Sequence, residues 1–317
     1  MKLHEQKETF SQAILTTAEY FKINEVFVEK DYWVSYVLKN LSQSKLKDTV
    51  VFKGGTSLSK AHKLIHRFSE DIDLALIQTG KESGNAIKGR IKEIETEITQ
   101  GLSELTIECI TSKGSKFRKT VFEYPRIIQS NQFGQATDKL LVEINSFANP
   151  HPHQQMLIQS MIADYLLQTN RKELIASNGL QAFSINVLGL ERTFTEKVLS
   201  LVRASYAENP MNEFSAKIRH VYDLHFILTK SAMREFVSGK EFQKMVQEVL
   251  ADDENNSQFQ GEWTKKPLKE ALIFADWKNT WKQLQAVYLN EFKSLVFSGL
   301  PTVNAIDESI QIILKAI

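Results

Sequence analysis

Residues 52–74 read FKGGTSLSKAHKLIHRFSEDIDL, in which a glycine turn is followed by two aspartates one residue apart. The turn, at residues 54–57, is predicted to open a short helix. Backbone amides at such a helix start can bind phosphate oxygens, because they point outward and the helix dipole favours negative charge. Asp71 and Asp73 are predicted to lie in a strand, where alternate side chains share a face, so both carboxylates can hold a hard cation. This order predicts a site for a nucleoside triphosphate and a metal ion.

Each half of this pattern is common by itself, and only the conjunction of the two is informative. Basic side chains surround the turn and could bind phosphates or simply form a solvated helix face; they are Lys53, Lys60, His62, Lys63, His66 and Arg67. We expect the nucleotide to be bound by Lys53, Gly54, Gly55, Thr56, Ser57, Arg67 and Ser69.

The pattern KGGTSLSKAHKLIHRFSEDIDLAL resembles the signature of the AbiEii/AbiGii-type nucleotidyltransferases. This family is a branch of the DNA polymerase β-like superfamily and includes toxins of type IV toxin–antitoxin systems. The resemblance extends from about residue 28 to 230, through VEKDYWVSYVLKNL at residues 28–41, TEKVLSLVRA at 195–204 and KIRHVYDLHFIL at 217–228. It implies an α+β fold: a polymerase β-like nucleotidyltransferase domain with a mixed β-sheet, followed by an α-helical domain.

The resemblance also implies a reaction. A nucleoside monophosphate would pass from an NTP to an acceptor hydroxyl with the help of Mg²⁺ or Mn²⁺, and an antitoxin would be encoded nearby. Related toxins act on RNA, so the 3′ end of tRNA is the expected acceptor. Three alternatives stay open: transfer to a protein hydroxyl, transfer to a small molecule, and a catalytically inactive binding module.

Composition is ordinary for a soluble globular protein, with 42% hydrophobic and 24% charged residues in a chain of 317. The net charge of +1 argues against a strongly basic, non-specific nucleic-acid binder. The single cysteine, Cys109, lies in the alternating run LTIECI and is expected to be a buried thiol in a reducing compartment. We find neither a signal-peptide pattern nor an apolar run of the roughly 18 residues that a span requires, and therefore expect a cytoplasmic protein without a membrane partner.

The periodicity of apolar residues predicts an α+β first half and a helical second half, divided at Gly189 into domains 1–189 and 190–317. In the first half, helices are predicted at residues 11–21, 28–41 and 83–105, and strands at 49–52, 71–77, 106–112, 116–124 and 139–147. In the second half, helices are predicted at 195–206, 213–229, 240–251, 280–297 and 304–317. The polar segment 251–267 is predicted to be a loop.

A third metal-binding carboxylate is expected from a neighbouring strand, as in polymerase β-like transferases. Glu143 is the best candidate, because Val142 and Ile144 form the apolar face of its strand and turn Glu143 to the other side. An exposed glutamate on a half-buried strand is the alternative. Asp138, just upstream, has the position of a turn residue.

Two residues of the helical half join the predicted catalytic set of Asp71, Asp73, Glu143, Lys197 and Asp223. The pattern Thr193 to Glu196 predicts a capping box, and the resemblance implies that Lys197, one residue on, contacts nucleotide phosphates. Asp223 could form an ordinary intrahelical pair with Arg219, or it could orient Lys197 or a substrate hydroxyl.

A basic hairpin is a possible RNA-binding element. Its basic residues are Lys113, Lys116, Arg118, Lys119 and Arg126, and its interleaved aromatic residues are Phe117, Phe122 and Tyr124. Alternating aromatic side chains in a hairpin can equally belong to the core of a sheet.

Overall fold

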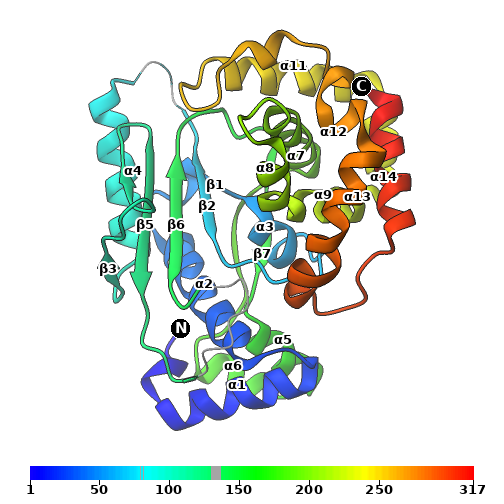
Figure 1. Cartoon of the computed structure of the whole chain (residues 1–317). Coiled ribbons are helices and arrows are strands. Elements are labelled where there is room, and N and C mark those ends of the chain that lie inside the picture. Colours follow the sequence, from blue (N-terminus) through cyan, green and yellow to red (C-terminus); the bar gives the residue numbers. More distant parts are fainter. Residues whose placement is uncertain (79, 81, 130–136) are drawn as a thin grey trace. The chain divides into compact units, whose positions relative to one another are not determined.

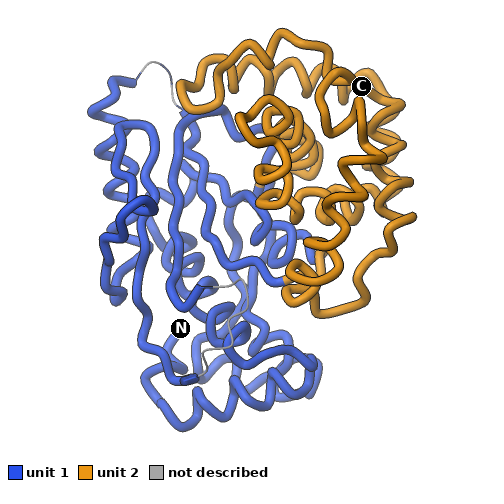
Figure 2. Tube along the Cα trace, viewed as in Figure 1, with its two compact units in different colours: residues 1–63, 68–187 blue, residues 64–67, 188–317 orange. Residues whose placement is uncertain are grey.

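The computed structural model describes residues 1–78, 80, 82–129 and 137–317. The chain divides into two compact units, shown in Figure 2. The first unit comprises Met1–Lys63 and Phe68–Val187, and the second comprises Leu64–Arg67 and Leu188–Ile317. A short segment just upstream of the aspartate pair therefore belongs to the second unit.

The first unit contains a mixed β-sheet, so the fold is α+β as the sequence predicts. The strand order is β3-β5-β6-β2-β1-β8-β7, and β4 pairs with β5. Strands β2 and β6 are parallel, as are β1 and β8, whereas β1 and β2 are antiparallel and so are β5 and β6. The strands are β1 Val50–Lys53, β2 Ile72–Leu76, β3 Ser103–Leu105, β4 Ser112–Lys113, β5 Phe117–Glu123, β6 Leu140–Asn145, β7 His153–Ile158 and β8 Phe183–Leu188.

Helices α2 and α4 pack against this sheet and against each other (Figure 1). Apolar side chains of β2 and β6, including Ile72, Leu74 and Val142, are fully buried in the same hydrophobic cluster as those of α2. Asn24 caps α2 by accepting a hydrogen bond from the Val26 amide. The helices of this unit are α1 Lys7–Phe21, α2 Glu25–Gln43, α3 Gly54–Lys60, α4 Gly84–Ile98, α5 Met161–Gln168 and α6 Lys172–Ser177.

The second unit is helical, with α7 packed against α9 and α11. The segment Leu64–Arg67 joins it through an isolated bridge between Arg67 and Val296 and a 2.8 Å hydrogen bond from the Phe297 amide to the His66 carbonyl oxygen. Its α-helices are α7 Leu190–Ala204, α8 Pro210–Ala216, α9 Ile218–Leu228, α10 Ser231–Ser238, α11 Lys240–Glu254, α12 Leu272–Ala275, α13 Trp277–Ala286 and α14 Val303–Ala316. A π-helical turn, Val287–Glu291, continues α13.

The segment after α4 differs from the prediction. The helix ends at Ile98 instead of residue 105, and Gly101, with φ +83°, lies in the turn that leads into β3. The strand predicted at 106–112 is absent. Cys109 lies in a turn between β3 and β4 with φ +63° and is exposed, so the expected buried thiol is wrong. In LTIECI only Leu105, at the end of β3, pairs with another of the described strands.

The predicted helix 213–229 is also wrong as a single element. The chain breaks at Lys217, with φ −100° and ψ 14°, which separates α8 from α9. Between β6 and Gly189 the sequence prediction assigned no elements, whereas the structure has β7, α5, α6 and β8 there.

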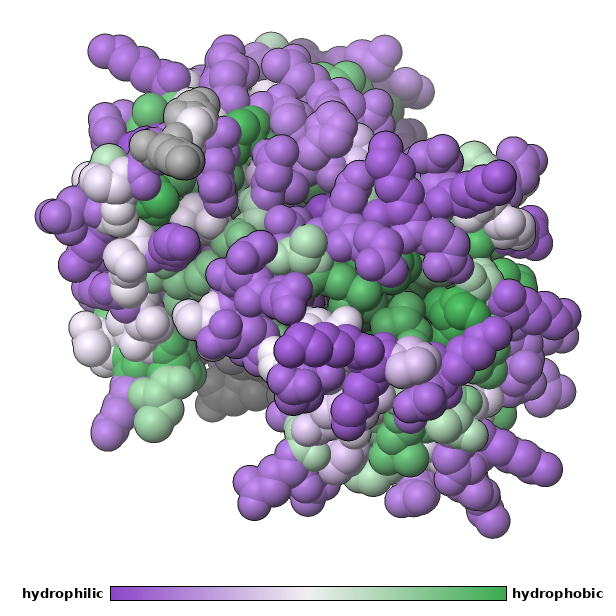
Figure 3. Space-filling view, turned by 90° about the horizontal axis from the view of Figure 1, so that it is seen from above, coloured by the Kyte–Doolittle hydropathy of each residue, from purple (hydrophilic) through white to green (hydrophobic). Residues whose placement is uncertain are grey.

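The face drawn in Figure 3 is mostly hydrophilic, with smaller hydrophobic areas between the polar side chains. Across the described ranges of the chain, none of the helices combines the length and the apolar character that a membrane span needs.

Candidate active site

The glycine turn brings α3 directly against the aspartate strand. Gly54 has φ +79°, and a Cβ atom added to it would lie 2.1 Å from Oδ2 of Asp73. Only glycine leaves room for this carboxylate. The Ser57 hydroxyl donates to the Gly54 carbonyl oxygen at 2.8 Å, and the Thr56 hydroxyl donates to Ser69 Oγ at 3.0 Å. The turn and the segment before β2 are thus linked by side chains as well as by the sheet.

Four charged residues form one row across the sheet. In the β1–β2 pair Lys53 lies opposite Asp73, in the β2–β6 pair Asp73 lies opposite Glu143, and in the β5–β6 pair Glu143 lies opposite Lys119. Residues in register on neighbouring strands project to the same face of a sheet, about 5 Å apart. The structure therefore brings Glu143 next to Asp73, although 70 residues of sequence separate them.

Asp71 also lies close enough to Glu143 to influence its pKa. Burial raises the pKa of the half-buried Glu143; Lys119 and Lys53 oppose this rise, and the negative charge of Asp71 adds to it. The Lys119 Nζ lies 3.9 Å from Glu143 Oε2. A carboxylate whose pKa is raised by a neighbouring carboxylate is a natural site for a cation, because the cation relieves the repulsion.

The donor set of Asp71, Asp73 and Glu143 fits a hard divalent cation, since Mg²⁺ and Mn²⁺ prefer carboxylate oxygens. In the ranges that the structure describes, no three acidic, histidine or cysteine side chains are grouped closely enough to hold a metal. The Asp73 carboxylate lies against Gly54. Asp73 and Glu143 are thus neighbours on one face of the sheet and Asp71 lies near Glu143, but among the described residues the three carboxylates are not gathered around a common point.

Asp138 behaves as a turn residue. It lies in a bend before β6, and its carboxylate pairs with Arg126 at 3.1 Å and with Lys139 at 3.3 Å. Both partners neutralise it locally.

The second unit contains a buried ion cluster built on Asp223. Arg67 donates from Nε to Oδ1 and from Nη2 to Oδ2, both at 2.7 Å, and Lys197 Nζ lies 2.8 Å from Oδ2. The Asp223 side chain is 0% exposed. Burial raises the pKa of Asp223, but Arg67 and Lys197 outweigh burial and bring the pKa well below its usual value. The partners of Asp223 are therefore Arg67 and Lys197, and the alternative of a simple pair with Arg219 is wrong.

The predicted capping box is wrong. Helix α7 begins at Leu190 with Gly189 as its N-cap, so Thr193 lies inside the helix, where its buried hydroxyl lacks a hydrogen-bond partner in the described structure. Glu196 pairs with Arg192, one turn earlier, at 3.0 Å. Glu196 supports the helix through this pair and not through a cap.

His220 lies beside the Asp223 cluster and is a residue that the sequence prediction missed. Burial lowers its pKa well below the usual value, and Lys197 adds to this effect. Its Nδ1 is buried and has no hydrogen-bond partner among the described residues. Its spacing of three residues from Asp223 on one helix was the available signal.

The basic hairpin is largely neutralised from within the first unit. Lys113 pairs with Glu104, Arg118 with Glu95, Lys119 with Glu143 and Arg126 with Asp138. The aromatic residues Phe122 and Tyr124 are buried, and Phe117 stacks on Phe147 with ring centroids 5.5 Å apart. These aromatic side chains are part of the packing of the sheet.

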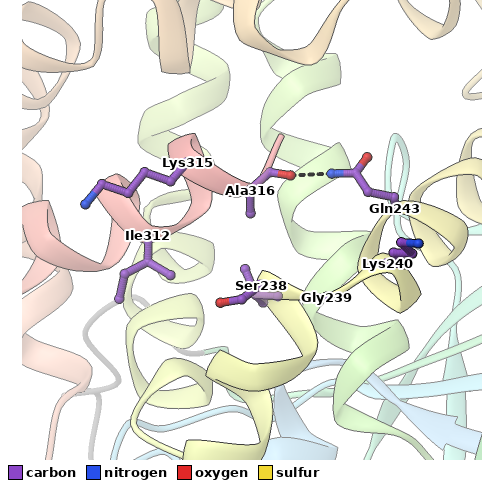
Figure 4. Close-up of a pocket in the computed structure, with 8 residues that line it drawn as sticks. Ser238, Gly239, Lys240, Gln243, Ile312, Lys315 and Ala316 are labelled. Carbon is purple, nitrogen blue, oxygen red and sulfur yellow. Dashed lines mark hydrogen bonds between the residues drawn. The ribbon is translucent and has the colours of Figure 1, made fainter.

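The second unit also has a cavity of about 470 Å³, between the α10–α11 junction and the end of α14 (Figure 4). Gln243 donates from its amide to the Ala316 carbonyl oxygen at its edge. The lining residues include none of the predicted site residues; they are Val237, Ser238, Gly239, Lys240, Gln243, Ile312, Lys315 and Ala316.

A sheet with carboxylates beside a glycine turn, followed by a helical unit, is the arrangement that the sequence analysis expects of a nucleotidyltransferase. The chain belongs to the family described as "Nucleotidyl transferase AbiEii toxin, Type IV TA system", which it matches over residues 36–308. It is thus a nucleotidyltransferase of a toxin–antitoxin family, as the sequence analysis predicts.

Two of the solved structures that are similar to the chain illustrate the likeness. One is "MenT4, nucleotidyltransferase toxin Rv2826c from Mycobacterium tuberculosis H37Rv", at 14% identity and a TM-score of 0.50, with 95% of this chain and 98% of that chain covered. This likeness concerns the fold. The other is JHP933 from Helicobacter pylori, at 16% identity and a TM-score of 0.37, with 85% of this chain and 99% of that chain covered. No curated protein sequence matches the chain.

Proposed function

We propose that the chain transfers a nucleoside monophosphate from an NTP to the 3′-hydroxyl of a tRNA and thereby acts as a toxin that arrests translation. The observation that carries the proposal is the register that sets Glu143 beside Asp73, next to the turn at Gly54. The reaction forms a bond between the acceptor oxygen and the α-phosphorus and breaks the bond to the β-phosphate oxygen. Pyrophosphate leaves, and the hydroxyl proton passes to solvent.

Each predicted site residue of the first unit has a role in this proposal. Lys53 and the turn, with Ser69 tied to it through Thr56, bind the phosphates. Asp71, Asp73 and Glu143 would hold Mg²⁺ or Mn²⁺. When bound, the metal neutralises the negative charge that develops on the attacking and leaving oxygens.

The cluster of the second unit supports a phosphate-binding lysine. Lys197 contacts nucleotide phosphates in this proposal, and Asp223 orients its ammonium group through the 2.8 Å pair. Arg67 in turn fixes both oxygens of Asp223 in a bidentate arrangement, which limits rotation of the carboxylate.

The choice of tRNA as the acceptor is based on the description of the family as toxins. NTPs and tRNA are cytoplasmic, so we place the protein in that compartment, where a cognate antitoxin would counteract it. Because most basic residues of the hairpin have carboxylate partners, the hairpin contributes little to the choice of an RNA acceptor.

The test is a labelling experiment with a matched pair of variants. Wild-type protein is incubated with each labelled NTP, Mg²⁺ or Mn²⁺, and either total RNA or cell protein. We expect label at the 3′ end of tRNA, its loss on addition of EDTA, and its loss in Asp73→Asn, which removes one charge at constant shape. Asp138→Asn makes the same change at a carboxylate that already has two local partners, and it should label normally.

Several outcomes would contradict the proposal. Undiminished labelling by Asp73→Asn would remove the assigned metal site. Label in protein instead of RNA would show that the acceptor is a protein hydroxyl. Label in neither fraction would refute transfer to a macromolecule. Circular dichroism of both variants checks that they remain folded.

A further inference from the structure

Asp71 lies outside the hydrogen-bonded part of the sheet. Strand β2 begins at Ile72, which pairs with Val142, and the pairing with β1 ends at Asp73. Among the described strands no register therefore includes Asp71, in contrast to Asp73 and Glu143. The position of Asp71 depends on Ile72, which the sheet holds, and on what holds the residue before it.

That residue, Glu70, forms a buried ion pair with Lys30 of α2. Lys30 Nζ lies 2.6 Å from Glu70 Oε2, and the Lys30 and Glu70 side chains are 0% and 10% exposed. Lys30 also donates to the Thr137 carbonyl oxygen at 2.5 Å and to the Thr137 hydroxyl at 3.1 Å. The ammonium group thereby has an acceptor for each of its three protons.

The second oxygen of Glu70 is held as well. Glu70 Oε1 accepts a hydrogen bond from the Thr137 amide at 3.1 Å. Ser69, one residue earlier, accepts the hydrogen bond from Thr56 in the glycine turn. Residues 69 and 70 are therefore tied by side chains to two different elements.

The pair also selects the side of the sheet to which Asp71 points. Ile72 and Leu74 are fully buried in the hydrophobic cluster that contains the apolar residues of α2. Continuing the alternation of β2 back by two residues places Glu70 on the side of Ile72 and Leu74, in agreement with its pair with Lys30 of α2, and places Asp71 on the side of Asp73 and Glu143.

We propose that Lys30 and Glu70 are positioning residues of the nucleotidyl transfer reaction, and that their buried pair fixes Asp71 beside Asp73 and Glu143. The inference rests on the proposed function, which assigns Asp71 to the metal. An apolar pair would fill the same volume without such hydrogen bonds, and buried ion pairs are seldom needed for stability. Compared with an apolar pair, the ion pair adds hydrogen bonds that fix the direction of the chain at Asp71.

The decisive variant is Glu70→Asp. It keeps the charge but shortens the side chain by one methylene, so the pair with Lys30 persists only if the chain at residues 69–71 moves toward α2. We expect a folded protein whose kcat falls on the order of 100-fold, the loss typical of a misplacement of about 1 Å. The KM for the NTP should change little, because the phosphate-binding turn is intact. Binding of Mn²⁺ to the free protein, measured without NTP or RNA, should be weaker.

Glu95→Asp is the matched control. Glu95 of α4 is likewise buried and ion-paired, and its partners Arg118 and Thr120 lie on β5, away from α3 and β2. The same shortening there should leave kcat and Mn²⁺ affinity unchanged. Glu70→Gln keeps the length and an acceptor for Lys30, so it should retain more activity than Glu70→Asp.

The inference is overturned if Glu70→Asp keeps the wild-type kcat and Mn²⁺ affinity, or if Glu95→Asp loses both to the same degree. Higher activity in Glu70→Asp than in Glu70→Gln would also overturn it. If the wild-type protein transfers no nucleotide, the proposed function fails separately. The Mn²⁺ titration then decides the inference alone: weaker binding by Glu70→Asp supports it, and equal binding refutes it.

Discussion

Replacement of Gly54 by alanine tests whether the close approach of the glycine turn to Asp73 matters for catalysis. Gly54 has φ +79°, and an added Cβ would lie 2.1 Å from Asp73 Oδ2 and 3.0 Å from its Cγ. Gly80 offers a matched control, because it has φ +78° and an added Cβ there would meet no atom of the described residues within 4 Å. Both substitutions carry the same backbone strain, and only one displaces a carboxylate.

The two effects have separable magnitudes. A residue with a Cβ in the left-handed region costs about 1–2 kcal/mol, and both variants should lose this much stability. Ordinary contact begins at 3.4 Å, so the Asp73 carboxylate must move by more than about 1 Å in Gly54→Ala. A shift of that size in a catalytic group reduces the rate on the order of 100-fold. Rotation of the Asp73 side chain makes room for the added methyl group at little cost in stability. Gly54→Ala should therefore reduce activity more than it reduces stability.

The assays are nucleotide transfer under saturating NTP and equilibrium unfolding in urea. We expect Gly54→Ala and Gly80→Ala to unfold at similar urea concentrations, while Gly54→Ala alone loses transfer. Equal transfer rates in the two variants would refute the argument that Asp73 must lie against the turn. A much larger stability loss in Gly54→Ala would show that Asp73 cannot rotate.

Two further predictions concern buried charges in the second unit. Asp223→Asn removes the carboxylate that neutralises Arg67 and Lys197, so it should lower the free energy of unfolding in urea by about 3–5 kcal/mol. Lys197→Met keeps the pair between Arg67 and Asp223, so it should abolish transfer with a smaller loss of stability. Equal destabilisation by the two variants would contradict this prediction. Burial raises the pKa of Asp253 from 3.8 to about 6, against the opposing charge of Arg203. Between about pH 4 and pH 6 the folded protein therefore holds a proton on Asp253 that the unfolded chain has lost, so the free energy of unfolding should fall as the pH rises through this range. Asp253→Asn should flatten this part of a plot of unfolding free energy against pH, and an unchanged slope would exclude Asp253 as its source.

The faces of the strands were predictable because they follow from local alternation. Val142 and Ile144 are buried, and Glu143 between them lies on the other side, as the sequence of β6 indicates. The neighbour of Glu143 was not predictable in this way. Its register with Asp73 depends on a parallel pairing between strands separated by α4 and the β5 hairpin, and no local pattern encodes that pairing.

The errors near Cys109 have a related cause. Alternation predicts burial only if the segment pairs with another strand, and β3 and β4 are short strands at the edge of the sheet with a turn between them. Cys109 and Ile110 are therefore exposed, Ile110 by 42%, whereas Leu105 and Ile107 are half-buried. The apolar residues do alternate in this segment, but the strand that the alternation predicts at residues 106–112 did not form.

Buried charges account for most of what sequence reasoning missed at the site, because charged residues are read as surface residues unless a partner is known. Asp223 meets Arg67 across 156 residues of sequence, and Lys30 meets Glu70 across 40. Burying such a charge is tolerable only when its partner is held in place, so each pair constrains two distant segments at once. Asp223 also pairs with Lys197, and Glu70 directly precedes Asp71. Both clusters therefore lie next to a proposed catalytic side chain, whereas the buried pair of Glu95 with Arg118 does not.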